Sequence, residues 1–246
     1  MRSRGSWALL LCLLPAVSSA KPLERYPTTH RFGISLGVGF GSASLSSFHQ
    51  CIDDTRVWIE RQGLKLDSAP KSGSQVNAEV GLRYYFPYHV LAHVGYGAVY
   101  NRASTGASVG PIRASVRTDQ LVTEVPLLIG GYHSILGRLY VFGALGPSPF
   151  FYARSWISAD PGGNSLLELS ADAGLGFHLL LGAELLVTRA IAVGLELRYR
   201  YLKTGDLRDR NLGVLTSGVL GGDSNRTYAL DLSGISLGIT VRPFVR

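Results

Sequence analysis

Two faces alternate along two adjacent stretches of the chain, Leu175–Val187 and Ile191–Tyr201: one face is wholly apolar, and the other carries glycine, histidine, glutamate and arginine, with Leu180 and Leu186 in the first stretch. In the second stretch every odd position is apolar or aromatic, and the even positions hold alanine, glycine, glutamate and arginine. A period of two is that of a β-strand whose two faces meet different surroundings. A transmembrane helix over the same residues would carry Glu184 and Glu196 through hydrocarbon, which is costly. The pattern therefore predicts two neighbouring membrane-spanning β-strands.

The parity of the two stretches also predicts how they join. The last residue of the first strand, Val187, and the first residue of the second, Ile191, both belong to the apolar face. The simplest connection is therefore the three-residue turn Thr188-Arg189-Ala190. In this register Glu184 faces Gly194, and Glu196 faces Gly182. Long charged side chains opposite glycines are what a narrow interior requires.

Similar alternation in six further stretches brings the expected number of strands to eight. Pro126 predicts a bulge or weakened pairing in the fourth strand, and Pro147 and Pro149 leave the two faces of the fifth undefined. Tyr228–Ser233 is shifted by one residue relative to the rest of the last strand, which predicts a bulge there. The six stretches are Phe32–Gly41, Val76–Phe86, Val90–Asn101, Arg117–Tyr132, Arg138–Arg154 and Tyr228–Arg242.

Short and long connections alternate along this order, which is typical of outer-membrane barrels with short periplasmic turns and long extracellular loops. The expected loops are 43–74, 104–116, 155–165 and 204–226, and both termini are expected on the periplasmic side. Within 43–74 the sequence allows either a short helix or an extension of the neighbouring strands. Aromatic residues gather near the strand ends, where interfacial girdles belong. The expected girdle residues are Phe32, Tyr84, Phe86, Tyr88 and Phe244 at the turn side, and Phe40, Tyr96, Tyr100, Tyr199 and Tyr201 towards the loops.

Composition supports a barrel in lipid over a barrel in water. Of the 246 residues, 46% are hydrophobic, only 17% are charged and 30 are glycine. A soluble lipocalin-type barrel, the rival fold, places apolar residues inside and polar ones outside. Here glutamate, arginine and glycine share the minority face. The sequence therefore predicts an all-β fold, an eight-stranded antiparallel transmembrane β-barrel.

The first twenty residues have the features of a signal peptide, with a basic start, an apolar run and small residues at Ser18-Ser19-Ala20. We expect a signal peptide over 1–20, a short periplasmic segment over 21–29 and the barrel over 30–246. Removing Arg2 and Arg4 lowers the formal charge from +7 to +5, and no basic stripe with interleaved aromatics indicates a nucleic-acid partner. Cys51 would then be the only cysteine, so no intrachain disulfide is expected.

With these features the chain resembles the small bacterial outer-membrane β-barrels related to the OmpA membrane domain, OmpX and OmpW. The resemblance covers about 30–244, and Leu181–Tyr201 and Ser233–Phe244 carry most of it. It implies a Gram-negative outer-membrane location, with outer-membrane lipids, lipopolysaccharide and the barrel-insertion machinery as partners. The sequence departs from these barrels at its end, where Val245 and Arg246 follow the aromatic Phe244.

The inward face is expected to hold charges of both signs, which should pair because isolated buried charges are costly. Glu79, Glu184 and Glu196 are expected across the lumen from, or diagonal to, Arg83, Arg198 and Arg200. The expected lumen ion-pair network comprises Glu79, Arg83, Glu124, Glu184, Glu196, Arg198, Arg200 and Arg242, with His93, Asp172 and His178 on the same face.

Three functions fit this interior. The first is a structural or surface-interaction barrel whose lumen is plugged by ion pairs, the second is a small-molecule conduit, and the third is a lipid A-modifying enzyme. A hydrolase would need a nucleophile, a base and an orienting acid near the outer rim. His133-Ser134 falls in a short turn, and His178 has no serine on its own strand. We therefore expect no catalytic residues, no cofactor and no metal site.

Overall fold

The computed structural model describes residues 31–44, 49–50, 53, 60, 65–67, 72–109, 112–135, 137–160, 165–188, 190–209, 213–214 and 227–245. The expected signal peptide 1–20 and the segment 21–29 lie outside these residues, as do Cys51 and most of 43–74 and 204–226. Within the described part of the chain, no helix is long and apolar enough to cross a membrane.

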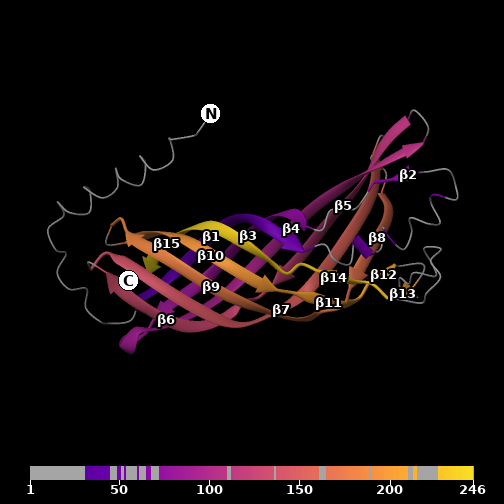
Figure 1. Ribbon diagram of the computed structural model, residues 1–246. Coiled ribbons are helices and arrows are strands. Elements are labelled where there is room, and N and C mark those ends of the chain that lie inside the picture. Colours follow the sequence, from indigo (N-terminus) through magenta and orange to yellow (C-terminus); the bar gives the residue numbers. More distant parts are fainter. Residues whose placement is uncertain are drawn as a thin grey trace, which may run out of the picture.

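Eight antiparallel strand positions close into a ring, because the first strand pairs with the last as well as with its neighbour in sequence (Figure 1). The pairing of Leu36 with Val241 and of Phe40 with Leu237 lies within this closing seam. The ring runs through β1 (Arg31–Ser44), β3 (Ser72–Tyr85), β4 (Val90–Val109), β5 (Ile112–Glu124) followed by β6 (Leu127–Ile135), β7 (Leu139–Asp160), β9 (Gly174–Leu186), β10 (Ile191–Tyr201) and β15 (Gly234–Val245).

Shorter elements continue these strands at the end of the barrel away from the short turns (Figure 1). β2 (Lys65–Leu66) pairs with β4, and β8 (Ser165–Ala171) pairs with β7. The others are β11 (Lys203–Asp206), β12 (Arg208–Asp209), β13 (Gly213–Val214) and β14 (Ala229–Asp231), while a single 3-10 turn, η1 (Pro87–His89), joins β3 to β4.

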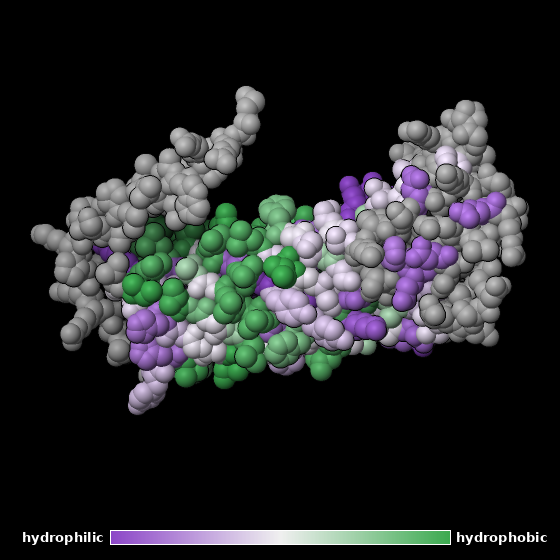
Figure 2. All heavy atoms as spheres, viewed as in Figure 1, coloured by the Kyte–Doolittle hydropathy of each residue, from purple (hydrophilic) through white to green (hydrophobic). Residues whose placement is uncertain are grey.

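The two faces of the strands are divided as the alternation predicts. Along β10 exposed and buried residues alternate without a break, so that Leu195 is 52% exposed whereas Glu196 is 3% exposed. Figure 2 shows the outward residues of the visible face as a green apolar belt, with polar surface beyond it towards the strand extensions. An apolar outside around a polar inside is the arrangement of a transmembrane barrel and the reverse of a soluble one.

The predicted registers are confirmed. Glu184 pairs with Gly194 and Glu196 with Gly182 across β9 and β10, and the amide of Val187 donates to the carbonyl of Ile191 at the turn. Across β3 and β4, Glu79 likewise lies opposite Gly97 and Arg83 opposite His93.

Two of the expected loops are wrong. The segment 104–116 is mostly a β-hairpin, paired without a break from Ser104↔Arg117 to Val109↔Ile112, and β7 and β8 occupy most of 155–165. Beyond the membrane both faces of a strand can meet water, so polar residues there do not signal a loop. The other two expected loops are also shorter, because β1 and β3 reach into 43–74 and β11, β12 and β13 lie within 204–226.

Pro126 interrupts the ladder where the sequence predicts. β5 ends at Glu124 and β6 begins at Leu127, with Val125 and Pro126 between them. The register against β7 shifts there, since Thr123 pairs with Tyr152 but Glu124 pairs with Phe150. At this bulge the inward positions of β7 change from even to odd residue numbers, and this defines the two faces of the strand. Before it the buried side chains are Phe142, Ala144, Ser148 and Phe150, and after it they are Ala153 and Ser155.

The bulge expected within Tyr228–Ser233 is wrong. Buried residues stay on even positions from Leu230 and Leu232 through Ser236 to Thr240, so the inward face continues unshifted. What changes is the chemistry of this face, which is apolar near the strand extensions and polar towards the short turns. The register shift lies on the neighbouring strand instead, between Lys203 and Asp206.

Candidate functional site

The eight charged residues of the lumen network all lie inside the barrel, with side chains only 1–7% exposed. Their strands, β3, β5, β9, β10 and β15, turn them inward by the alternation described above. The set has four glutamates and four arginines, so its formal charge is zero. Removing eight charges from water is costly unless each is paired, and every one has a partner of opposite sign.

Six of these residues form one chain of alternating sign along the lumen. Arg83 stands at its centre, with Nη2 2.5 Å from Glu196 Oε1 and Nη1 3.5 Å from Glu184 Oε2. Arg242 pairs with the other oxygen of Glu184. At the opposite end Arg198 bridges Glu196, at 3.1 Å, and Glu79. The expected opposition of glutamates and arginines is therefore observed for Arg83 and Arg198.

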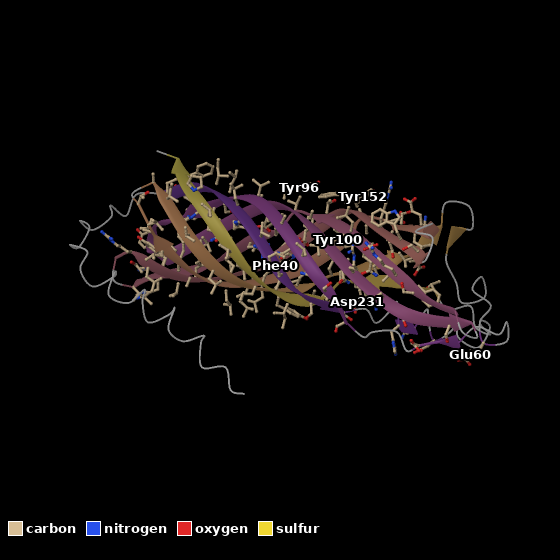
Figure 3. All side chains as sticks on the ribbon, turned by 90° about the horizontal axis from the view of Figure 1, so that it is seen from above. Phe40, Glu60, Tyr96, Tyr100, Tyr152 and Asp231 are labelled. Carbon is tan, nitrogen blue, oxygen red and sulfur yellow. The ribbon has the colours of Figure 1, made fainter. Side chains whose placement is uncertain are left out.

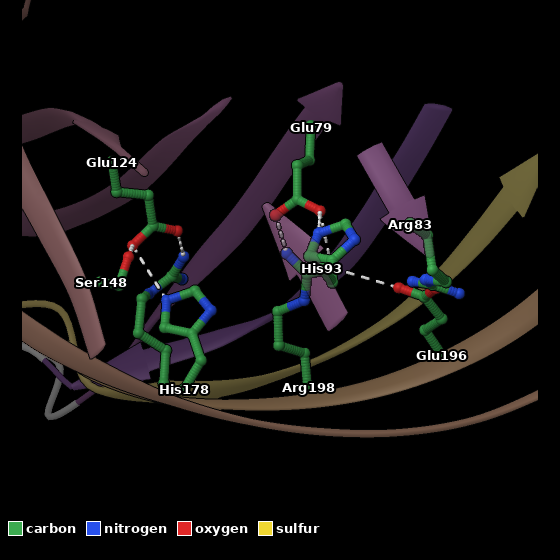
Figure 4. A network of polar contacts seen from close by, with 9 residues as sticks. Glu79, Arg83, His93, Glu124, Ser148, His178, Glu196 and Arg198 are labelled. Atoms are coloured by element: carbon green, nitrogen blue, oxygen red, sulfur yellow. Dashed lines mark hydrogen bonds and ion pairs between the residues drawn. The ribbon is translucent and has the colours of Figure 1, made fainter. Parts of the chain in front are cut away.

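Histidine and aromatic rings complete this chain. His93 Nε2 lies 2.8 Å from Glu79 Oε1, beside the pair that Glu79 makes with Arg198 (Figure 4). The guanidinium of Arg83 lies over the ring of Phe142, with its carbon 4.6 Å from the ring centroid. Arg242 lies in the same way over Tyr85 and Phe244, at 4.3 and 4.5 Å. Such cation–π contacts stabilise arginines whose hydration has been removed.

A second cluster is centred on Glu124. Arg200 Nη1 lies 3.0 Å from Glu124 Oε1, and His178 Nε2 lies 2.9 Å from Oε2 (Figure 4). Arg200 thus pairs with Glu124, not with the three glutamates opposite which it was expected. Ser148 Oγ donates to the same Oε2 at 3.2 Å. The sequence did not indicate Ser148, because the prolines on both sides of it hid the faces of its strand.

Ser148, His178 and Glu124 are the residue types of a hydrolase triad, but their order is different. In a triad the imidazole lies between the hydroxyl and the carboxylate, so that it can take the hydroxyl proton. Here the carboxylate lies between the other two, and both contact the same oxygen. All three side chains are also buried, with at most 2% exposed. The arrangement holds an ionised glutamate in place and does not activate a nucleophile.

The charged network has a very small cavity beside it and an apolar cluster at each end. A cavity of about 10 Å³ lies beside Glu79, Arg198 and Asn77, against the glycines of β1 and β15. That is about the room of one water molecule. Towards the turns lies a cluster of Tyr85, Leu91, Leu128, Phe142, Ala144 and Leu180, and towards the extensions a larger one that includes Val122, Phe150, Leu169, Leu202, Leu230 and Leu232.

The expected position of Asp172 is wrong. It lies in the break between β8 and β9, where its side chain is 73% exposed and 3.3 Å from Arg208. The break releases it from the alternation that would have turned it inward. His93 and His178 do lie inside.

The aromatic residues expected at the interfaces form two groups along the strands, one beside the short turns and one towards the strand extensions. At the turn end Tyr84 and Phe86 form an edge-to-face pair with centroids 4.4 Å apart. Figure 3 shows Phe40, Tyr96 and Tyr100 towards the other end. Among the described residues, no group of three or more histidine, cysteine, aspartate or glutamate side chains could hold a metal ion.

No protein-family model and no curated protein matches this chain. Among solved structures it is similar to Neisserial surface protein A, at 10% identity over 87% of this chain and 97% of that chain, with a TM-score of 0.40. It is also similar to Ail, the attachment invasion locus protein of Yersinia pestis, in complex with the heparin analogue sucrose octasulfate (15% identity, 87% and 98% covered, TM-score 0.39). A third is the outer membrane protein OprG from Pseudomonas aeruginosa (12% identity, 87% and 94% covered, TM-score 0.40). Likenesses this weak assign no role to any residue of the chain.

Proposed function

We propose that this protein is a bacterial outer-membrane β-barrel whose interior is closed, and that it acts through its outer surface and not by conducting solutes. The apolar belt on the outside of the ring supports the membrane location. The strand extensions, which carry polar outward side chains beyond that belt, supply the surface that meets lipid headgroups and medium (Figure 2).

One observation carries the proposal: the lumen is filled by a charge-balanced network of paired side chains. Eight strands enclose an interior only just wide enough for side chains to fill. The glutamates and arginines cross that interior in contact with one another, and the cavity beside Arg198 has room for about one water molecule. A hydrated ion would have to separate several buried pairs in order to pass.

A conduit with a lateral opening beside the proline-rich part of β7 is the second candidate. The strand is paired through that region, with Pro147 opposite Phe177 and Pro149 opposite Leu175 on β9. On its other side the amide of Val125 donates to the carbonyl of Pro149 at 2.8 Å. The backbones also approach closely at Gly146, where an added Cβ would lie 2.0 Å from the carbonyl oxygen of Leu127. These contacts favour a sealed wall over a lateral opening.

A lipid-modifying enzyme is the third candidate. It would need a serine, a histidine and an acid that reach lipid near the outer rim. The contacts among Ser148, Glu124 and His178 lie inside the barrel and in the wrong order, so they do not support this chemistry.

A vesicle-swelling assay tests the closed interior. The refolded mature protein would be placed in vesicles, and its folded fraction would be measured by heat-modifiable migration in gel electrophoresis. We expect arabinose to enter these vesicles no faster than it enters protein-free vesicles. Rapid swelling at a high folded fraction would contradict the proposal and favour the conduit.

A further inference from the structure

Three neighbouring strands, β4, β5 and β7, carry a group of arginine, tyrosine and aspartate side chains on their outward face, beyond the apolar belt. We call it the arginine–tyrosine patch and define it by Tyr100, Arg102, Arg117, Asp119, Tyr152 and Arg154. Strand pairing makes it continuous, since Arg102 lies opposite Asp119, and Leu121, two residues on, lies opposite Arg154. The lumen network does not include any of these residues.

One carboxylate holds two guanidinium groups side by side. Arg102 Nε lies 2.8 Å from Asp119 Oδ1, and Arg117 Nε lies 2.7 Å from Asp119 Oδ2. The hydroxyl of Tyr100 donates to Asp119 and accepts from Arg102 Nη2 at 2.6 Å. Asp119 is largely covered by its partners, at 17% exposed, while the two arginines are 48% and 41% exposed. The arginines are thus fixed in place and still present donors to the surroundings.

The charge of the patch is unbalanced at this point. Arg102 and Arg117 share a single carboxylate, which leaves one positive charge, whereas Arg154 has Glu168 of its own at 2.9 Å. Two adjacent guanidinium groups suit a phosphate, because each can donate two parallel hydrogen bonds to its oxygens. Two tyrosine rings also belong to the patch. The guanidinium carbon of Arg102 lies 5.4 Å from the ring centroid of Tyr100, and that of Arg154 lies 4.7 Å from the ring centroid of Tyr152.

The height of the patch fits lipid headgroups. Tyr100, which was expected in the aromatic girdle, lies beyond Tyr96 towards the strand extensions (Figure 3). Arg102 follows Tyr100 by two residues on the same outward face of β4. Two residues of a strand tilted by about 40° rise about 5 Å along the membrane normal. The headgroup layer extends about 5–8 Å beyond the hydrocarbon on each side. Because these side chains face sideways from the barrel wall, their direction and height favour a neighbouring lipid of the outer leaflet as the ligand over a partner in the medium.

We propose that the arginine–tyrosine patch binds a phosphorylated, sugar-bearing lipid headgroup of the outer leaflet, the chemistry of lipopolysaccharide. Arg102 and Arg117 bind the phosphate, and the rings of Tyr100 and Tyr152 lie against the sugar. This inference rests on the proposed outer-membrane location, but the experiment below is done on purified protein and does not depend on where the cell places it.

The test is native mass spectrometry of the full mature barrel in detergent, titrated with bisphosphorylated lipid A and with the same lipid after removal of its phosphates. The patch variant is Arg102→Gln with Arg117→Gln. The control is Lys203→Gln with Arg208→Gln, which removes the same charge from exposed positions at the outer end of other strands. We expect the patch variant to bind bisphosphorylated lipid A about tenfold more weakly or worse, since two charge-assisted contacts are lost. The control should stay within about twofold of the unmodified protein by the same reckoning.

Three results would overturn the proposal. The first is equal binding by the patch variant and the control at matched folded fractions. The second is equal binding of the phosphorylated and dephosphorylated lipids, which would remove the phosphate from the recognition. The third is full competition by millimolar inorganic phosphate, which would show a site for free anion and not for a lipid. The location is tested separately by fractionating cells. If the purified protein bound the lipid but the cellular protein were absent from outer membranes, the binding site would stand and the proposed location would be contradicted.

Discussion

Replacing Glu196 by glutamine should destabilise the folded barrel by about 3 kcal/mol. Breaking a buried ion pair by removing one partner costs about 3–5 kcal/mol, because the other charge stays buried. Glu196 contacts both Arg83 and Arg198, and its side chain is 3% exposed. Each arginine keeps a second carboxylate, Glu184 at 3.5 Å from Arg83 and Glu79 beside Arg198, which places the expected loss near the lower end of that range.

The matched control is Glu168→Gln. Glu168 is also paired with an arginine, at 2.9 Å, but the pair lies on the surface with side chains 42% and 52% exposed. Exposed pairs contribute about 0–1 kcal/mol, so this change should be close to neutral. Urea titrations of both variants in lipid vesicles, followed by tryptophan fluorescence, would give the two differences in unfolding free energy. If Glu196→Gln lowered the unfolding free energy no more than Glu168→Gln does, the buried network would not contribute to stability in the way described.

Three other perturbations address separate parts of the structure. Leu195→Arg, on the lipid face of β10, should cost about 2–4 kcal/mol in the same vesicle titration, and a neutral result would mean that this face does not meet hydrocarbon. Gly182→Ala should also destabilise the barrel, by about 1–3 kcal/mol, because its Cβ would lie 2.4 Å from the ring of Phe142, whereas Ala192→Gly, at a buried lumen position without that clash, serves as its comparison. Burial raises the pKa of Asp119, but hydrogen bonds from Tyr100, Arg102 and Arg117 outweigh it and lower that pKa below its ordinary value. Asp119 therefore stabilises the strand extensions above its ordinary pKa of about 4, and this contribution is lost as the pH falls through the lowered value. The advantage of the unmodified protein over Asp119→Asn in resistance to pepsin should shrink as the pH falls below about 4, and an advantage that grew with acid would contradict this sign.

Strand positions, facing and register could be predicted from the sequence because the membrane imposes a sharp contrast between lipid and lumen. Where one face of β10 is all apolar and the other all polar or small, a shift by one residue would bury charge in lipid, so the register is fixed. Glu184 opposite Gly194 follows from this alone.

The contrast fails wherever the surroundings on the two faces become alike. Along 104–116 small and polar residues occupy both odd and even positions of the sequence, so a strand there resembles a loop. At Leu230 and Leu232 the inward face turns apolar, which resembles a register shift although the parity is unchanged. The inward position of Ser148 could not be predicted for a third reason. Its side-chain direction depends on how β7 pairs with its neighbours around Pro147 and Pro149, which the sequence alone does not show.

The alternation in the sequence also does not predict which charged residues pair across the lumen. Alternation places Arg200 inside the barrel but not at a particular glutamate. The tilt and stagger of eight strands bring it to Glu124, 76 residues away in sequence, and bring Arg198 to Glu79. The arginine–tyrosine patch was missed in the same way, because it becomes continuous only when three strands are paired.

Single-channel recording in planar bilayers tests the closed lumen most directly. The purified, refolded protein would be added at a measured folded fraction, with Glu196→Gln recorded beside it under the same salt and voltage. The network described here predicts no steady conductance from the unmodified protein, and a loss of stability in the variant before any current appears. A steady, large conductance from the unmodified, fully folded protein would contradict the closed interior and favour a conduit.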